Sequence, residues 1–265
     1  MTENYGILIF AKSLQQNRFY LSPDDASTAM KIDDPKILSL RAKARAAHEE
    51  FDTARACHEA WKPAAYDEAL HERIGRSFAA NTFIVLRQAL RREMLLALMR
   101  LWDNNSQAVG MKSIANSLQD KRIMDARRIE AKFGREQSDA LRQRATEAIA
   151  IIDTYTDGGS RYSTYKKLKR LRDEHLAHRQ VTPTPAEVVG ADTTDEEIEN
   201  FYQDMSRLIR LLRGSIEDTD YNPEETAKLR RRHAALFWAG VRGERTEGHP
   251  DYEPPRLAPR HRSEG

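Results

Sequence analysis

Residues 83–102 read FIVLRQALRREMLLALMRLW and form the most apolar stretch of the chain. Apolar residues recur there every three or four positions, as one face of an α-helix requires; they are Phe83, Leu86, Leu90, Met94, Leu98 and Leu101. Further apolar residues widen this face until little polar surface remains, namely Ile84, Val85, Leu95, Leu96 and Met99. A helix of this kind is buried on most sides, so we expect residues 66–102 to form a helix in the middle of a bundle.

Helix signals continue on both sides of this stretch. Asp34 and Pro35 suit the N-cap and first turn of a helix that runs to about Trp61 and breaks at Pro63. A short helix is expected over residues 113–118. A long amphipathic helix is expected over 135–155, ended by the sequence DGGS at 157–160. Its predicted buried face consists of Leu141, Ala145, Ala148, Ile152 and Tyr155.

Three more helices are predicted in the second half of the chain. The first covers residues 161–179. The second begins at a capping box formed by Thr194 and Glu197 and is closed by Gly214. Its apolar stripe consists of Ile198, Phe201, Met205, Leu208, Ile209 and Leu212. The last opens at Asn222-Pro223 and runs to about Trp238.

These elements predict an all-α protein, a helical bundle with long central helices, a short N-terminal arm and a disordered C-terminal tail. With 12 Gly and 10 Pro in 265 residues, the body has few turn residues, which argues against a sandwich or a barrel. The expected division is an arm at 1–34, one helical domain at 35–240 and a flexible tail at 241–265. The tail is rich in Pro, Arg and Glu and has little apolar surface to bury.

Composition narrows the classes of function. The 43 basic and 41 acidic residues leave a net charge of +2, so a nucleic-acid partner would have to be recognised by a local patch. The single cysteine, Cys57, excludes an intramolecular disulfide and a Cys-rich zinc module. The longest apolar run, residues 94–99, is too short to span a bilayer, and the N-terminus lacks the pattern of a signal peptide. We therefore expect a cytoplasmic protein without a membrane segment.

Residues 165–179, which read YKKLKRLRDEHLAHR, are the best candidate for chemistry. On a helical wheel, His175 and His178 occupy the same stripe as Leu168 and Leu171, and Arg172 lies on its flank. A polar side chain in such a position needs a partner, a cleft or another subunit. Arg172 and His178 lie about 120° apart on the wheel and ~9 Å apart along the axis, so they can converge on a shared ligand but not touch as neighbours.

The sequence RDEHLAH at 172–178 resembles the R-x(4–6)-H signature of the HEPN superfamily. The stretches LMRLWD at 98–103 and GMKSIANSL at 110–118 are similar to the AbiU-type abortive-infection branch of that superfamily. The likeness covers roughly residues 70–215. It implies a helical bundle, usually dimeric, with two Arg–His motifs gathered at the interface. Many members are metal-independent ribonucleases of toxin–antitoxin or phage-defence systems, and others are inactive and bind nucleotides or partners.

The resemblance assigns roles to individual residues. His178 would act as base or acid, because a histidine titrates near neutral pH, and Arg172 would clamp phosphate oxygens. Asp173 would orient a histidine or the arginine, and His175 either assists or is incidental. The expected RNA-binding residues are Lys166, Lys167, Lys169, Arg170 and Arg179. Arg100 and Asp103 are candidates for supporting roles. No third ligand accompanies the two histidines, so neither a metal nor another cofactor is expected.

The leading hypothesis is therefore a metal-independent endoribonuclease, a homodimer that acts on RNA and is controlled by an antitoxin or other regulatory protein. The alternative is a catalytically silent helical module that binds a partner protein or a nucleotide. A third possibility is a pure assembly scaffold. The plainer interpretations of the motif are a surface salt bridge for Arg172 and a structural core or interface role for the histidines.

Overall fold

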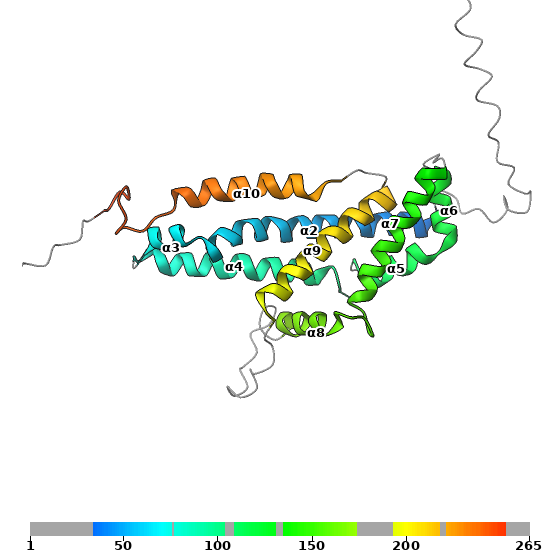
Figure 1. The fold of residues 1–265 in the computed structure, drawn as a ribbon, viewed down its shortest axis with the longest axis horizontal. Helices are drawn as coiled ribbons and strands as arrows, with labels where there is room; N and C mark the ends of the chain where they lie inside the picture. The colour runs from blue at the N-terminus through cyan, green and yellow to red at the C-terminus, as the bar shows by residue number, and fades with distance from the viewer. Residues whose placement is uncertain are drawn as a thin grey trace, which may run out of the picture.

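The computed structural model describes residues 34–75, 77–103, 109–130, 135–173, 193–217 and 221–252, and every regular element within these ranges is a helix (Figure 1). The α-helices are α2 (Pro35–Tyr66), α3 (Glu68–Ile74), α4 (Ala79–Arg100), α5 (Met111–Gln119), α6 (Lys121–Glu130), α7 (Arg135–Thr154), α8 (Tyr162–Leu171), α9 (Asp195–Leu212) and α10 (Pro223–Gly240). A π-helical segment, η2 (Arg213–Glu217), follows α9 directly. The expected all-α class is confirmed. None of the described helices combines the length and apolar character needed to cross a bilayer.

The long helix α2 is the axis of the bundle. It packs between α4 and α10, and α9 crosses it obliquely (Figure 1). α5, α6 and α7 gather at one end and α3 at the other, while α8 lies beside the N-terminal end of α9. The buried face of α2 consists of residues three or four positions apart, each at most 2% exposed. They include Ile37, Leu40, Ala44, Ala47, Phe51 and Ala54.

The start of α2 agrees with the sequence, but its end does not. The Asp34 carboxylate accepts a hydrogen bond of 2.8 Å from the backbone N–H of Lys36, so Asp34 is the N-cap and Pro35 follows it. We expected Pro63 to end this helix, but α2 continues through it to Tyr66. Proline removes one backbone donor, yet its carbonyl still accepts, and the Pro63 carbonyl takes a 2.9 Å hydrogen bond from the N–H of Asp67.

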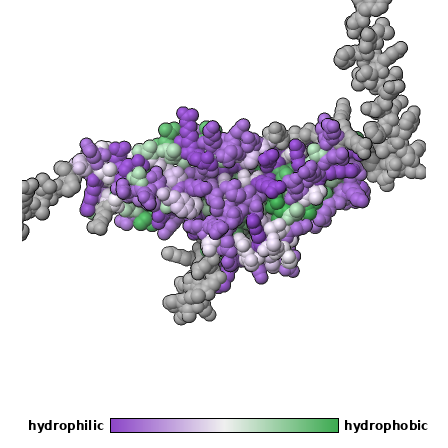
Figure 2. Space-filling model, in the orientation of Figure 1, coloured by the Kyte–Doolittle hydropathy of each residue, from purple (hydrophilic) through white to green (hydrophobic). Residues whose placement is uncertain are grey.

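The helix expected over residues 66–102 is divided. Gly75 adopts a φ of +51°, which ends α3, and α4 starts at Ala79. The expectation that this segment is buried on most sides holds for Met94–Met99 but is wrong for the first half of α4. There Ile84, Val85 and Leu86 are 42%, 61% and 43% exposed. The surface view in Figure 2 is mostly hydrophilic, with separate hydrophobic patches.

The reason for this difference is that the bundle has two apolar clusters of unequal size. The first half of α4 contributes Phe83 and Leu90 to a small cluster that also contains Leu70, Ile74 and Trp238. The second half enters the main core, which joins α2, α4, α5, α7 and α9. A periodic apolar pattern does not tell how many neighbouring helices surround each turn.

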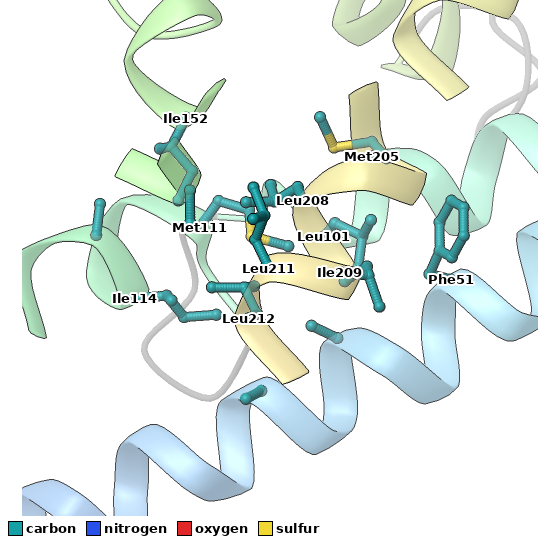
Figure 3. Close-up of a cluster of buried hydrophobic side chains, with 14 of the residues drawn as sticks. Phe51, Leu101, Met111, Ile114, Ile152, Met205, Leu208, Ile209, Leu211 and Leu212 are labelled. Atoms are coloured by element: carbon teal, nitrogen blue, oxygen red, sulfur yellow. The ribbon is translucent and has the colours of Figure 1, made fainter. Parts of the chain in front are cut away.

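The main core confirms the faces predicted for α7 and α9. All five residues expected on α7, including Tyr155 just beyond its end, are at most 4% exposed, and all six on α9 are at most 3% exposed. Figure 3 shows α9 residues Leu208, Ile209 and Leu212 gathered with Phe51 of α2 and Ile114 of α5. The capping box is also present, since the Thr194 side chain accepts from the Glu197 N–H and the Glu197 carboxylate accepts from the Thr194 N–H.

Three further features differ from the sequence interpretation. The helix α6 was not predicted, because its sequence KRIMDARRIE is mostly charged. Gly214 does not close α9, since the chain continues as η2 to Glu217. Part of the segment expected to be a flexible tail, residues 243–246, is hydrogen-bonded to the bundle. There the Gly243 N–H donates to the Arg73 carbonyl at 3.0 Å, and the Glu244 carboxylate accepts from the Phe78 N–H at 3.0 Å. Residues 1–33 and 253–265 lie outside the described residues.

The unequal burial of α4 predicts unequal costs for the same substitution in one helix. Leu98→Ala removes a fully buried side chain and is expected to lower the free energy of unfolding by about 3 kcal/mol. Leu86→Ala, at a position that is 43% exposed, should lower it by less than about 1 kcal/mol. Urea denaturation followed by circular dichroism measures both. Equal losses would contradict the placement of α4.

Candidate functional site

The candidate segment is positioned by a tight reversal between α7 and α8. Gly158 has a φ of +85°, and a Cβ on Gly159 would lie 2.2 Å from the Asp153 carbonyl, so only glycine fits at residue 159. The N–H of Arg161 closes the turn on the Thr154 carbonyl at 3.0 Å. The glycines expected to end α7 therefore also return the chain so that α8 lies beside α9.

An aromatic cluster anchors α8. The ring of Tyr165 lies 5.4 Å from that of Trp102 at the end of α4, and Trp102 also contacts Tyr155 and Phe201. The Trp102 indole N–H points at the sulfur of Met205, 3.3 Å away. Together with Leu168, which is 1% exposed, these contacts attach α8 to α4 and α9.

Polar contacts fix the same helix from its other side. Asp204 of α9 accepts a 2.6 Å hydrogen bond from the Tyr155 hydroxyl and forms an ion pair with Arg161. Burial, and then the hydrogen bond to Asp204, raise the pKa of Tyr155, so its hydroxyl remains a donor. Further along α8, Lys167 donates to Glu197 at 2.8 Å. The position of α8 thus depends on α9.

Arg172 and Asp173 lie just past the end of α8 and contact each other. The Arg172 Nε donates to Asp173 Oδ1 at 2.7 Å, while Asp173 Oδ2 accepts from Lys169 at 2.8 Å. Partial burial opposes ionisation of Asp173, but the hydrogen bonds from Lys169 and Arg172 together outweigh this effect and lower the pKa of the carboxyl. The Arg172 side chain is only 20% exposed. The two residues form an ion pair, in which Asp173 orients the arginine.

The predicted RNA-binding lysines differ in their surroundings. Lys167 and Lys169 are held in ion pairs with Glu197 and Asp173. Lys166 is exposed and its ammonium lies 5.0 Å from the centre of the Tyr162 ring. Arg170, one turn further on, is exposed as well. Lys166 and Arg170 are thus exposed, and the paired side chains of Lys167 and Lys169 are still 39% and 45% exposed.

The proposed supporting residues lie at the end of α4. Arg100 pairs with Glu50 of α2 at 2.6 Å and with Glu93 at 2.8 Å, which ties α4 to α2. Burial opposes the charge of Arg100, yet these two carboxylates raise its pKa. Asp103 is partly buried beyond Trp102. His175, His178 and Arg179 lie outside the described residues, so the assignment of catalytic and RNA-binding roles stays a prediction.

A buried polar network that we did not predict connects α9 to α2 and α10. His58 is 2% exposed, its Nε2 lies 2.8 Å from Glu199 Oε2, and its ring stacks on Tyr202 at 3.8 Å. Its Nδ1 is 3.5 Å from Glu59, which in turn binds Arg231 of α10 at 2.9 Å. The signal available in the sequence was helical spacing, since positions 51, 54 and 58 share one face of α2.

The charges of this network stabilise one another. Burial disfavours protonated His58, but the hydrogen bonds to Glu199 and Glu59 and the charges of these two carboxylates together outweigh it and raise the pKa of His58. The hydrogen bond with His58 lowers the pKa of Glu199 to about 2. Glu59 has a lowered pKa too, because His58 and Arg231 overcome its burial. The network is enclosed by α2, α9 and α10, which suits a structural role.

Metal-ligating side chains are not clustered in the part of the chain that the structure describes. Within it, no group of three or more His, Cys, Asp or Glu residues is arranged to hold a metal ion. Cys57 is a free thiol whose pKa is raised by burial and then by Glu93.

This bundle, with an arginine anchored where α8 ends, defines a HEPN-type helical module. The HEPN AbiU2 family model, described as AbiU2, matches residues 37–238, and the chain belongs to this family. The match runs from the first turn of α2 to Trp238 in α10, so it covers more of the bundle than the likeness seen in the sequence. Comparison with curated proteins and with solved structures gave no match.

The His58–Glu199 pair predicts a pH-dependent stability. The folded pKa of His58 is raised, so its contribution is full below about pH 6.5 and is lost as the pH rises through that raised value. The folded pKa of Glu199 is depressed to about 2, so its contribution is present above pH 4.5 and lost as the pH falls toward 2. Glu199→Gln should therefore cost about 1–2 kcal/mol at about pH 5.5 and less at about pH 8.5.

Urea denaturation at the two pH values measures this difference. Glu196→Gln, an exposed acid in the first turn of the same helix, is the matched control and should shift stability equally at both. A Glu199→Gln cost that does not change with pH would refute the proposed coupling.

Proposed function

We propose that this protein is a metal-independent endoribonuclease of a defence or toxin–antitoxin system, with Arg172 and His178 as its catalytic pair. The observation that carries the proposal is the anchored Arg172 of the RDEHLAH motif in a chain of the AbiU2 family. Family membership alone does not establish an activity, so the proposal depends on the chemistry of this segment.

Cleavage of RNA without a metal needs three tasks performed at one phosphodiester. A base takes the proton of the 2′-OH, whose oxygen attacks phosphorus. The bond from phosphorus to the 5′-oxygen then breaks, and an acid protonates the leaving oxygen. The products are a 2′,3′-cyclic phosphate and a 5′-hydroxyl. His178 serves as base or acid, because imidazole exchanges a proton near neutral pH. Use of the 2′-OH restricts the reaction to RNA.

Arg172 supplies charge stabilisation in this scheme. Asp173 takes the Nε side of the guanidinium, and the remaining N–H groups are those that bind the phosphate oxygens as their charge grows. A side chain that is already held in place loses little freedom when the substrate binds, which supports preorganisation. His175, three residues before His178, is the nearest second imidazole in the sequence.

The exposed cations of α8 guide the RNA backbone. Lys166 and Arg170 are exposed, and Lys167 and Lys169 form ion pairs with Glu197 and Asp173. Each phosphate contact releases counterions, so affinity falls with salt in proportion to the number of contacts. Two exposed cations per chain provide few contacts, and Arg179 adds a third in the same motif.

A homodimer completes the proposed site. Arg172 and His178 are too far apart on one helix to touch, and a second copy of the motif brings the complementary residues together. The exposed residues Ile84, Val85 and Leu86 of α4 support an apolar contact surface for another chain. An antitoxin or other regulatory protein would keep such a nuclease silent until it is needed.

A cleavage assay tests the proposal. Purified protein is incubated with total RNA and with tRNA in EDTA, beside Arg172→Ala and His178→Ala. The wild type should give products that end in a 2′,3′-cyclic phosphate, and each variant should be slower by about 100-fold or more. Lys112→Ala, which removes an exposed cation on α5, is the control and should cleave like the wild type.

Two outcomes count against the proposal. If folded His178→Ala cleaves at the wild-type rate, the motif is not the catalytic site. If the wild type yields no product on any RNA, the silent module that binds a protein or nucleotide becomes the better description.

A further inference from the structure

A recess lies at the opposite end of α9 from the candidate nuclease segment. It has a volume of about 250 Å³ and is bounded by α7, by the junction of α9 with η2, and by Tyr221. Arg144 and Glu147 line it from α7, and Arg210 and Gly214 line it from the junction. Between Glu197 and Leu211 the helix rises about 20 Å, so the recess is separate from the contacts of α8.

Gly214 makes room for one of the two arginines. A Cβ at Gly214 would lie 3.2 Å from both Cδ and Nη1 of Arg144, so this glycine lets the guanidinium lie against the backbone. Nη1 of Arg144 is 3.4 Å from the Gly214 carbonyl, which is a long and weak hydrogen bond. Within the described residues, neither Arg144 nor Arg210 has a carboxylate partner at ion-pair distance. Both guanidiniums keep most of their donors available.

Three basic side chains pack around Tyr221 at one side of the recess. The guanidinium carbon of Arg55 lies 5.4 Å from the centre of the Tyr221 ring, and that of Arg213 lies 5.8 Å from it. Arg55 is fully buried, and its Nε and Nη2 have no partner among the described groups. His48 packs edge-on against Tyr221, and its pKa is lowered by burial and then by Arg213. Both arginines are themselves paired with carboxylates, Arg55 with Asp52 at 2.8 Å and Arg213 with Glu217 at 2.5 Å, so the charge offered to a ligand comes from Arg144 and Arg210.

One carboxylate on the lining opposes this potential. Glu147 is hydrogen-bonded by Arg207 at 2.9 Å and by Gln143 at 3.1 Å. These contacts, and then the nearby charge of Arg210, keep the pKa of Glu147 low. Arg207 offsets part of the charge of Glu147, and the donors of Arg144 and Arg210 remain available to a ligand.

We propose that this recess binds the phosphoryl group of a small molecule. Two guanidinium groups, each with paired N–H donors, match the geometry and the double negative charge of a phosphate. A carboxylate needs only one guanidinium. The volume is below the ~300–1,000 Å³ of pockets that enclose drug-sized ligands, so the occupant is a phosphate or a compact phosphomonoester. π-helical segments such as η2 recur at functional sites, in agreement with this placement.

Calorimetric titration of the full chain at low ionic strength tests the site, because salt screens exposed charges. The probes are inorganic phosphate and ribose 5-phosphate, with chloride at equal ionic strength as the reference. Saturable binding of one ligand per chain is expected. Tighter binding of ribose 5-phosphate would identify the ligand as a phosphomonoester, and equal binding would identify free phosphate.

Variants on one helix separate the site from general charge. Arg144→Ala and Arg210→Ala should each weaken binding by at least about tenfold. Arg142→Ala is the matched control on α7, since its side chain is 58% exposed and pairs with Asp125, and it should bind like the wild type. Glu147→Gln removes the opposing charge and should tighten binding.

The absence of saturable binding would overturn the proposal, and so would equal weakening by Arg142→Ala and Arg144→Ala. Circular dichroism of each variant verifies that it is folded. The titration contains no RNA, so its failure is distinct from failure of the proposed nuclease.

Discussion

The packing of α9 against α2 and α7 holds both the candidate nuclease segment and the arginine recess in place. Six apolar side chains between Ile198 and Leu212 are at most 3% exposed, and they fill the space between the other helices of the main core. The N-terminal half of α9 provides the acids that bind α8, and its C-terminal end runs into η2 and the arginine recess. A shift of α9 along its axis would therefore change both regions together.

Ion pairs between helices reduce the number of basic side chains that could contact an RNA partner. The chain has nearly equal numbers of acids and bases, and the structure uses many of them between helices. Arg100 joins α4 to α2, and Lys167 joins α8 to α9. Such cations are weaker candidates for RNA contacts, because a phosphate would compete with the carboxylate that each already contacts. Counting basic residues in the α8 segment thus overstates its capacity to bind RNA.

Local signals were sufficient for much of the fold. Apolar spacing predicted the buried faces of α7 and α9, and cap residues predicted where α2, α9 and α10 begin. The break at Gly75 was missed, because a single glycine inside a helical pattern is tolerated and gives a weak signal. Sequence periodicity also misjudged Ile84 and Val85, whose burial depends on how many helices surround them.

In the candidate site, contacts between residues close in sequence could be predicted, and contacts between residues far apart in sequence could not. The Arg172–Asp173 contact joins neighbours, so a motif is enough to single it out. The pair of His58 and Glu199 joins residues 141 positions apart, and the recess joins α7 to the end of α9. No local pattern specifies such contacts, because they follow from how the helices cross.

The electrostatics of the α8 end explain why the nuclease hypothesis includes a second chain. The C-terminal end of a helix carries partial negative charge from its free carbonyls, which favours Arg172 but repels a phosphate. Asp173 adds a full negative charge beside the same guanidinium. Lys169 offsets that charge, Arg170 lies about half a turn back along the helix, and Lys166 lies about one and a half turns back. A second motif facing the first would bring a second Arg172 guanidinium to the phosphate, together with a second Asp173. We propose dimerisation for this reason, since two facing motifs would place guanidiniums on two sides of one phosphate.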